Sequence, residues 1–284
     1  MEYFRVRLLA ALLALLTLGG CSGLVSGLTS QMANDLADSI LNSEDIDTVR
    51  EGIPAYLLLI DSFLRGSPDS EELLLAASNL NGSFAVLVDD EARIKLLADK
   101  SIRYAEQAAC AGQGRLCGLR AQDFKRFEQE VESIEAGDVG VAYALAVAWV
   151  GWIQANSADW AAIAELGKAK LLMQQVIELD ETYENGGPHL YMGGMETILP
   201  ASLGGRPEKG REHFERAIEI NDDYLMTKVI FAEQYARLVF DQALHDQLLR
   251  QVLDADPVVE GMTLTNRIAQ ERAAQLLETS SEYF

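Results

Sequence analysis

The sequence has few of the residues that catalytic centres and metal sites usually require. It contains three histidines, three cysteines and six prolines in 284 residues. None of His189, His213 and His245 lies in an HExxH motif or beside a nucleophile motif, and no glycine-rich stretch ends in the Lys-Ser/Thr pair of a phosphate-binding loop. We therefore expect a protein that is not an enzyme and that uses no metal or cofactor.

Basic residues are also scarce. Lys and Arg number 23 against 44 Asp and Glu, and the net charge is -21 at pH 7. A chain this acidic repels phosphate backbones and anionic headgroups. This argues against nucleic acid as a partner and against broad binding to anionic lipid.

The first twenty residues have the layout of an export signal. Two arginines precede an apolar run over residues 8–18, which is too short to span a bilayer as a helix. The run ends in "LGGC", which resembles a bacterial lipobox, where an aliphatic and two small residues precede the cysteine that receives lipid. We expect residues 1–20 to be removed, Cys21 to be lipidated and residues 21–30 to form a linker. The alternative is a free Cys21 after an ordinary signal.

A lipidated Cys21 would attach the chain to a membrane without a transmembrane helix. Lipoproteins of diderm bacteria with Asp after the cysteine tend to stay on the inner membrane, so Ser22 slightly favours the outer membrane. We expect a periplasmic, lipid-anchored location. In that oxidising compartment the stretch "CAGQGRLC" favours a disulfide between Cys110 and Cys117. Two free thiols are the alternative.

Residues 31–284 form one predicted all-helical domain. Long strands are hard to find, and alanine, leucine, glutamate and glutamine abound. Apolar residues recur at helical spacing over residues 70–88 and 90–109, and Asp90 is suited to cap the second of these helices. The uncharged run over residues 139–153 is short for a membrane span and favours a core helix that is apolar all round.

The second half of the chain shows a degenerate repeat. Three amphipathic segments end near Asp180, Asn221 and Asp256, and Ile177, Ile218 and Leu253 occupy matching places, 41 and 35 residues apart. A tetratricopeptide repeat has about 34 residues. The pattern predicts an all-α fold of degenerate tetratricopeptide-like helix pairs, stacked into one compact solenoid or bundle with a central cleft or pore. A bundle without repeats is the alternative. The predicted helices of the last two pairs are 188–199, 207–220, 222–237 and 240–254.

Residues 184–221 are the most distinctive part of the sequence. Two glycines inside a predicted helix, Gly193 and Gly194, each cost about 1 kcal/mol relative to alanine, which a close helix crossing or a ligand opening would offset. The residues "GPHLY" from Gly187, "LGG" from Leu203 and "AIEI" from Ala217 resemble the T-component lipoproteins of TRAP transporters. That resemblance implies a periplasmic, lipid-anchored, tetratricopeptide-like protein that forms homotrimers and binds the transporter's substrate-binding protein. It also implies a cleft or pore for a hydrophobic or organic-acid ligand. An envelope scaffold without a small ligand is the alternative.

Seven side chains are candidates for that cleft. His189 starts a predicted helix after a Gly-Gly-Pro turn, and its alternative is a structural hydrogen bond. The aromatic bulk within residues 139–153 is either core packing or the wall of a channel, and Glu196 is either in the cleft or solvated. His213 and His245 are expected to be exposed on charged helices. The candidates are Tyr143, Trp149, Trp152, His189, Tyr191, Met192 and Glu196.

Overall fold

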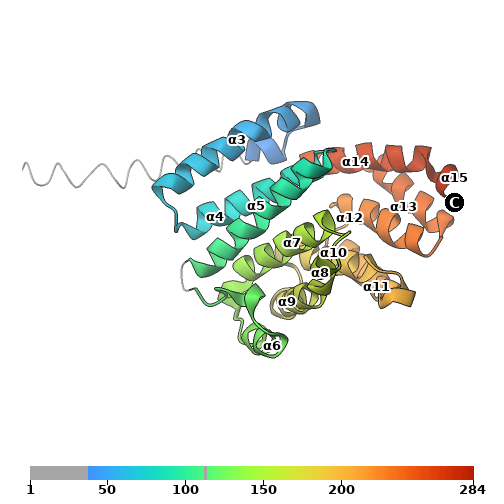
Figure 1. Cartoon of the computed structure of the whole chain (residues 1–284). Coiled ribbons are helices and arrows are strands. Elements are labelled where there is room, and N and C mark those ends of the chain that lie inside the picture. The colour runs from blue at the N-terminus through green and yellow to red at the C-terminus, as the bar shows by residue number, and fades with distance from the viewer. Residues whose placement is uncertain (1–37, 112–113) are drawn as a thin grey trace, which may run out of the picture.

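The computed structural model describes residues 38–111 and 114–284, and every regular element in those ranges is helical. The prediction of an all-α fold is confirmed, whereas the signal, the lipidation site Cys21 and the linker lie outside the described residues. Figure 1 shows the order of the helices. The α-helices are α3 (Ile46–Gly66), α4 (Glu71–Val86), α5 (Glu91–Cys110), α6 (Phe124–Glu132), α7 (Val139–Ala155), α8 (Trp160–Ala164), α9 (Leu166–Leu179), α10 (Tyr183–Thr197), α11 (Pro207–Ile220), α12 (Met226–Ile230), α13 (Gln242–Asp254), α14 (Thr263–Glu278) and α15 (Ser280–Tyr283).

Short polar side chains begin many of these helices. The Asp90 carboxylate accepts a hydrogen bond of 2.8 Å from the backbone N–H of Arg93, so the predicted cap is confirmed. Such a bond satisfies one of the four N–H groups that a helix start leaves without a partner. The other N-cap side chains that accept from the first turn are Asp45, Ser70, Asp123, Asp159 and Asp241.

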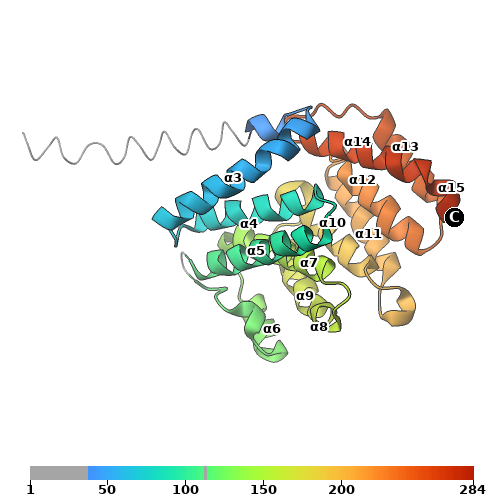
Figure 2. The same cartoon turned by 45° about the horizontal axis from the view of Figure 1, so that its top comes forward.

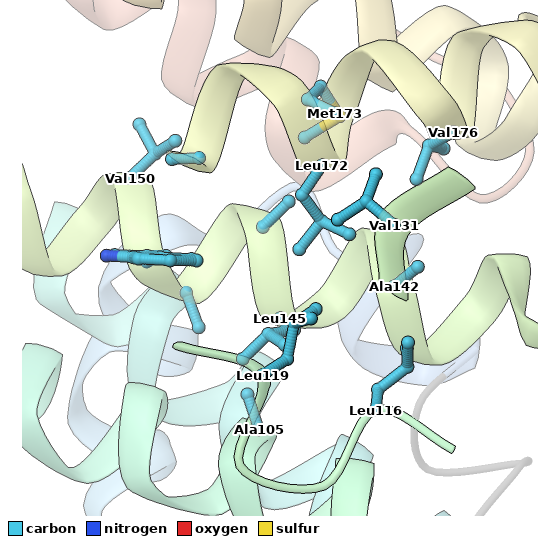
Figure 3. Packing of buried hydrophobic residues seen from close by; sticks show 14 of the residues in the cluster. Ala105, Leu116, Leu119, Val131, Ala142, Leu145, Val150, Leu172, Met173 and Val176 are labelled. Atoms are coloured by element: carbon cyan, nitrogen blue, oxygen red, sulfur yellow. The ribbon is translucent and has the colours of Figure 1, made fainter. Parts of the chain in front are cut away.

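Helix α7 lies at the centre of the fold. It contacts α4, α5, α9 and α10, and Trp149 and Ile153 are fully buried. Figure 3 shows α7 side chains between those of the loop after α5 and those of α9. Among the described residues, the segment Ala136–Ala155 alone is long and apolar enough to cross a membrane, and half of it is buried inside the protein. Its contacts on several sides are those of a core helix.

The N-terminal part of the described chain packs against the start of α14. α14 contacts α3, and Figures 1 and 2 both place the first turns of α3 next to the first turns of α14. The Gly261 N–H donates to the Asn42 side-chain oxygen at 2.8 Å, and Arg267 pairs with Glu44. These contacts join the first described helix to the C-terminal part of the fold. A tetratricopeptide arrangement of its pairs stays a prediction.

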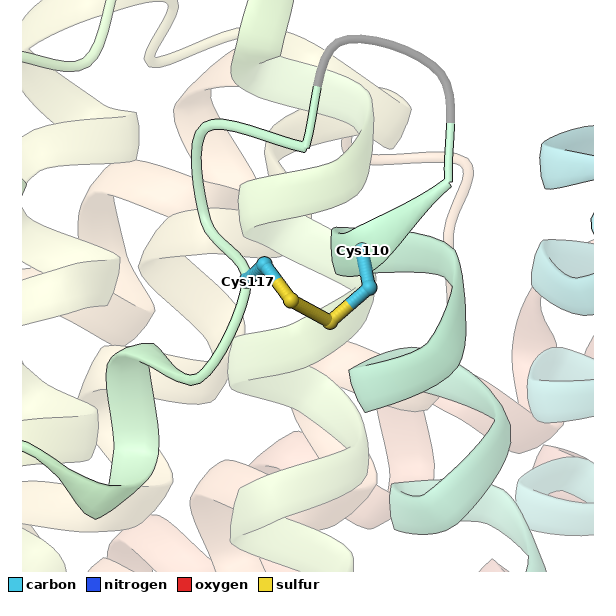
Figure 4. The surroundings of a disulfide bond; sticks show 2 residues. All are labelled: Cys110 and Cys117. Carbon is cyan, nitrogen blue, oxygen red and sulfur yellow. A yellow bond between two sulfur atoms is a disulfide. The ribbon is translucent and has the colours of Figure 1, made fainter.

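A disulfide joins the end of α5 to the loop that follows it. The sulfur atoms of Cys110 and Cys117 are bonded at 2.00 Å (Figure 4). This is the pairing that the spacing favoured, and the bond closes a short loop beside α7.

Two predicted helices have different bounds in the structure. The predicted helix over 222–237 begins only at Met226, because the preceding turn is held by Asn266, whose side-chain oxygen accepts the Leu225 N–H at 3.1 Å. Its second half, Phe231–Ala236, is π-helical. The predicted helix over 188–199 begins at Tyr183 and ends at Thr197, with an interruption described below.

Glycines let α10 and α11 cross closely. A Cβ atom at Gly193 would lie 2.8 Å from the ring of Phe214, and one at Gly210 would lie 2.7 Å from Cγ2 of Thr197. Real Cβ atoms do not approach so closely, so both glycines are required by the crossing. The close helix approach expected at Gly193 is present.

Gly193→Ala should therefore lower the free energy of unfolding by about 1–3 kcal/mol, because the added methyl group overpacks the Phe214 ring. Thermal or urea unfolding measures the change. Gly151→Ala in α7 is the matched control, since no atom lies within 4 Å of its added Cβ. It should raise stability by about 0.5–1 kcal/mol. Equal effects of the two variants would contradict the role of the crossing.

Candidate functional site

Helix α10 contains a left-handed turn near its start. Glu184, Asn185 and Gly186 have φ angles of 46°, 59° and 82°, and the regular helix resumes at Gly187 and Pro188. The left-handed conformation costs about 1–2 kcal/mol at a residue with a Cβ atom. The strain is thus concentrated in two neighbouring residues, and positions of this kind cluster at functional sites.

Four tyrosines gather around this turn. The ring of Tyr143 in α7 lies 5.0 Å from that of Tyr183 and 6.0 Å from that of Tyr191, centroid to centroid, both edge to face. Tyr224, before α12, is close enough to affect the pKa of Tyr143 and of Tyr191. We call these four residues the tyrosine cluster. All four side chains are half-buried, and none of their hydroxyls has a hydrogen-bond partner in the described part of the chain.

The surroundings of the tyrosine cluster raise the pKa of all four tyrosines. Burial raises the pKa of Tyr143 well above its usual value, and Tyr191, Tyr224 and Glu184 raise it further. Burial, Tyr224 and Glu184 raise the pKa of Tyr191 in the same way. The hydroxyls therefore stay protonated near neutral pH and are able to donate hydrogen bonds. The rings are crowded by protein atoms and are still reached by solvent.

Gly187 allows the Tyr143 ring to reach the backbone of α10. A Cβ atom at this position would overlap the Tyr143 hydroxyl. The glycine before Pro188 is therefore needed for the position of the ring at the centre of the tyrosine cluster.

His189 connects three elements. Its Nδ1 lies 2.9 Å from Nδ1 of His213 in α11, and its Nε2 lies 3.2 Å from a carboxylate oxygen of Glu181, before α10. Arg216 holds Glu181 with bonds of 2.6 and 3.1 Å. The tautomers that satisfy both contacts have Nε2–H of His189 donating to Glu181 and Nδ1–H of His213 donating to His189. Both rings are then neutral.

Burial lowers the pKa of His213 to about 4, and His189 adds to the effect. Burial also lowers the pKa of His189, although Glu181 opposes it. The expected exposure of His213 and His245 is wrong. His213 is half-buried against His189, and His245 is fully buried, with its Nδ1 3.0 Å from Asp246. His213 packs against His189 in α10, and His245 packs against Phe284 after α15, so both side chains are covered by other parts of the fold.

Glu196 is buried, with 1% of its surface exposed. Lys170 in α9 donates to it at 2.9 Å, and Arg206 donates through Nε at 3.0 Å. Burial raises the pKa of Glu196, but the hydrogen bonds from Arg206 and Lys170 outweigh it and the net shift is downward. The solvated alternative for this carboxylate is wrong, because both cations close over it.

The remaining candidates belong to the core cluster around α7 or pack against it. Trp149 is fully buried and its Nε1–H donates to Glu165 at 2.6 Å. Trp152 donates to Asp99 at 2.9 Å, and the Arg120 guanidinium lies 4.2 Å above its ring. Met192 is buried in the core cluster around α7. Of the seven candidates, the structure brings Tyr143 and Tyr191 together.

Two small pockets lie elsewhere on the described surface. One of about 260 Å³ adjoins Cys110 and Arg120, and one of about 330 Å³ lies near Asp61 and Tyr104. None of the seven candidates lines either pocket. The central cleft or pore stays a prediction.

Comparison with known families decides the class of protein. The family model described as TRAP transporter T-component matches residues 42–284. The chain belongs to the TRAP transporter T-component family. No curated protein matches the sequence. The protein is therefore an accessory component of TRAP transport, which acts at the cell envelope, and its family is not one of enzymes.

Sequence reasoning missed half of the tyrosine cluster in this T-component. Tyr183 and Tyr224 belong to "IELDETY" and "IEINDDY", and they are 41 residues apart, the same spacing as Ile177 and Ile218. The repeat alignment thus places the two tyrosines at equivalent positions and was the signal that could have found them. The contacts of Glu181 with His189 and Arg216 had no comparable signal, because they join the turn before α10 to positions on α10 and α11 that only the fold brings near it.

The burial of His213 predicts that the folded protein loses stability in acid. In the unfolded chain His213 binds a proton below its ordinary pKa of 6.5, whereas in the folded protein it does so only near pH 4. Stability should therefore fall as the pH is lowered from 6.5 towards 4, with up to about one proton taken up on unfolding. Urea unfolding at several pH values measures this dependence. His213→Gln should flatten it, and an unchanged dependence in that variant would contradict the prediction.

Proposed function

We propose that the protein is a periplasmic, lipid-anchored component that binds the substrate-binding protein of a TRAP transporter and holds a small ligand with an apolar body at the tyrosine cluster. The observation that carries the proposal is the family match over residues 42–284. The tyrosine cluster supports the ligand-binding part, since it offers aromatic surface together with hydroxyl donors that have no hydrogen-bond partner among the described residues. Apolar walls with a few polar groups are typical of small-molecule sites.

A complex with the substrate-binding protein is the first expected result. The full chain in non-ionic detergent should co-purify with the tagged substrate-binding protein of the same transporter. Because the chain carries a net charge of -21, the affinity should change with ionic strength if its acidic surface takes part. An unrelated periplasmic binding protein serves as the control. Failure to form a complex over a range of salt and substrate concentrations would argue for the scaffold alternative.

The lipobox supports the proposed anchor. Cys21→Ala should move the protein from the membrane fraction to the soluble periplasmic fraction, because no lipid would be attached. Ser22→Ala is the matched control and should leave the protein in the membrane fraction. Fractionation followed by immunoblotting measures the distribution. Membrane retention of the Cys21→Ala variant would rule out lipid as the sole anchor.

The homotrimer is a further part of the proposal and rests on the family resemblance alone. Native mass spectrometry of the detergent-solubilised chain separates a trimer from a monomer or dimer by mass. The same spectrum shows whether a small molecule stays bound, which the envelope-scaffold alternative does not require.

A further inference from the structure

The tyrosine cluster has no cationic side chain among the described groups that act on it. Its titration is influenced by other tyrosines and by acidic groups, and no lysine or arginine is among those influences in the described residues. The basic side chains of the adjoining helices are engaged elsewhere. Arg216 in α11 is paired with Glu181 and Glu219, and Lys228 in α12 is paired with Asp222 at 2.6 Å.

Glu184 supplies an unpaired negative charge at the edge of the cluster. Its side chain is exposed and makes no ion pair or hydrogen bond within the described part of the chain. It influences all four tyrosines. Its backbone is the first of the left-handed residues, with φ of 46°, so its position depends on the turn that also separates Tyr183 from Tyr191. The strained backbone and the unpaired carboxylate therefore belong to the same described residue, Glu184.

The rings themselves attract positive charge. The face of a neutral tyrosine carries partial negative charge and binds ammonium groups, most strongly where water is largely displaced. The ring centroids of Tyr183 and Tyr191 lie 5.0 and 6.0 Å from that of Tyr143. Protein atoms crowd these rings and have already displaced much of their water. Gly187 maintains this arrangement by admitting the Tyr143 hydroxyl.

We infer that the tyrosine cluster, with the Glu184 carboxylate at its edge, is a binding site for an organic cation of the alkylammonium class. The rings contact the alkylated ammonium group and the carboxylate balances its charge. An organic acid, which the family resemblance implied as a possible ligand, finds no counter-charge here. The inference rests on the proposed ligand-binding function of the same cluster and specifies its ligand.

Three probes of one shape and different charge test this. Choline is the cation, 3,3-dimethylbutan-1-ol is its neutral isostere, and 3,3-dimethylbutanoate is the anion. Isothermal titration calorimetry on the full chain in non-ionic detergent measures each affinity. Choline should bind about tenfold more tightly than the alcohol, and the anion should bind most weakly.

Variants then assign the preference to the cluster. Glu184→Gln should reduce the preference for choline over the alcohol to about threefold, with alcohol binding unchanged. Glu260→Gln removes the same charge from another exposed position and should leave the preference intact. Tyr183→Leu should weaken choline more than the alcohol, because it removes a ring and leaves an apolar side chain. Circular dichroism verifies that each variant is folded.

Several results would overturn the inference. These are an absence of choline binding at millimolar concentration, equal affinity for choline and the alcohol, tighter binding of the anion, or equal effects of the Glu184 and Glu260 variants. The complex with the substrate-binding protein is measured on the same preparations. A complex without choline selectivity refutes the cation site alone, whereas choline selectivity without a complex refutes the proposed partner alone.

Discussion

The close crossing of α10 and α11 is the contact on which the candidate site depends. Gly193 and Gly210 remove the Cβ atoms that would hold the two helices apart, and Phe214 fills the resulting contact. Because the crossing is tight, α10 has little freedom to rotate or slide. Its left-handed turn, and therefore Tyr191 and Glu184, are held against α7 on one side and α11 on the other. Packed interiors transmit such constraints because they contain little free volume.

Charge is used in two different ways around α10. At its far end Glu196 is buried and neutralised by Lys170 and Arg206, which ties α9 and the turn before α11 to the helix. Near its start Glu181 is matched by Arg216 and His189. Of these three glutamates, Glu184 alone has no such partner among residues 38–111 and 114–284. Buried charges must be paired to be tolerated, whereas an exposed, unpaired carboxylate is available to a ligand.

The helix content was predictable because it depends on local spacing. The apolar period, the scarcity of proline and the capping Asp90 each report on a few neighbouring residues. Two residues of the tyrosine cluster, Tyr143 and Tyr191, were among the candidates taken from the sequence, one from the aromatic bulk of α7 and one from the family motif. The inward positions of His213 and His245 were not, because each sits on a polar stretch and its burial is decided by the helix that covers it.

The sequence by itself determined the helices, the likeness to the T-component family and the glycines that a close approach would need. Tertiary structure decided which polar groups became partners and which stayed free. Trp149 and Glu196 looked suitable for a ligand and found hydrogen-bond partners within the protein, while Tyr183, Tyr224 and Glu184 were inconspicuous and have side chains without a hydrogen bond to any described residue. The reason is that the hydrogen bonds of Trp149 and Glu196 reach residues 10 to 26 positions away in the sequence. Their formation depends on distances that no local sequence pattern contains.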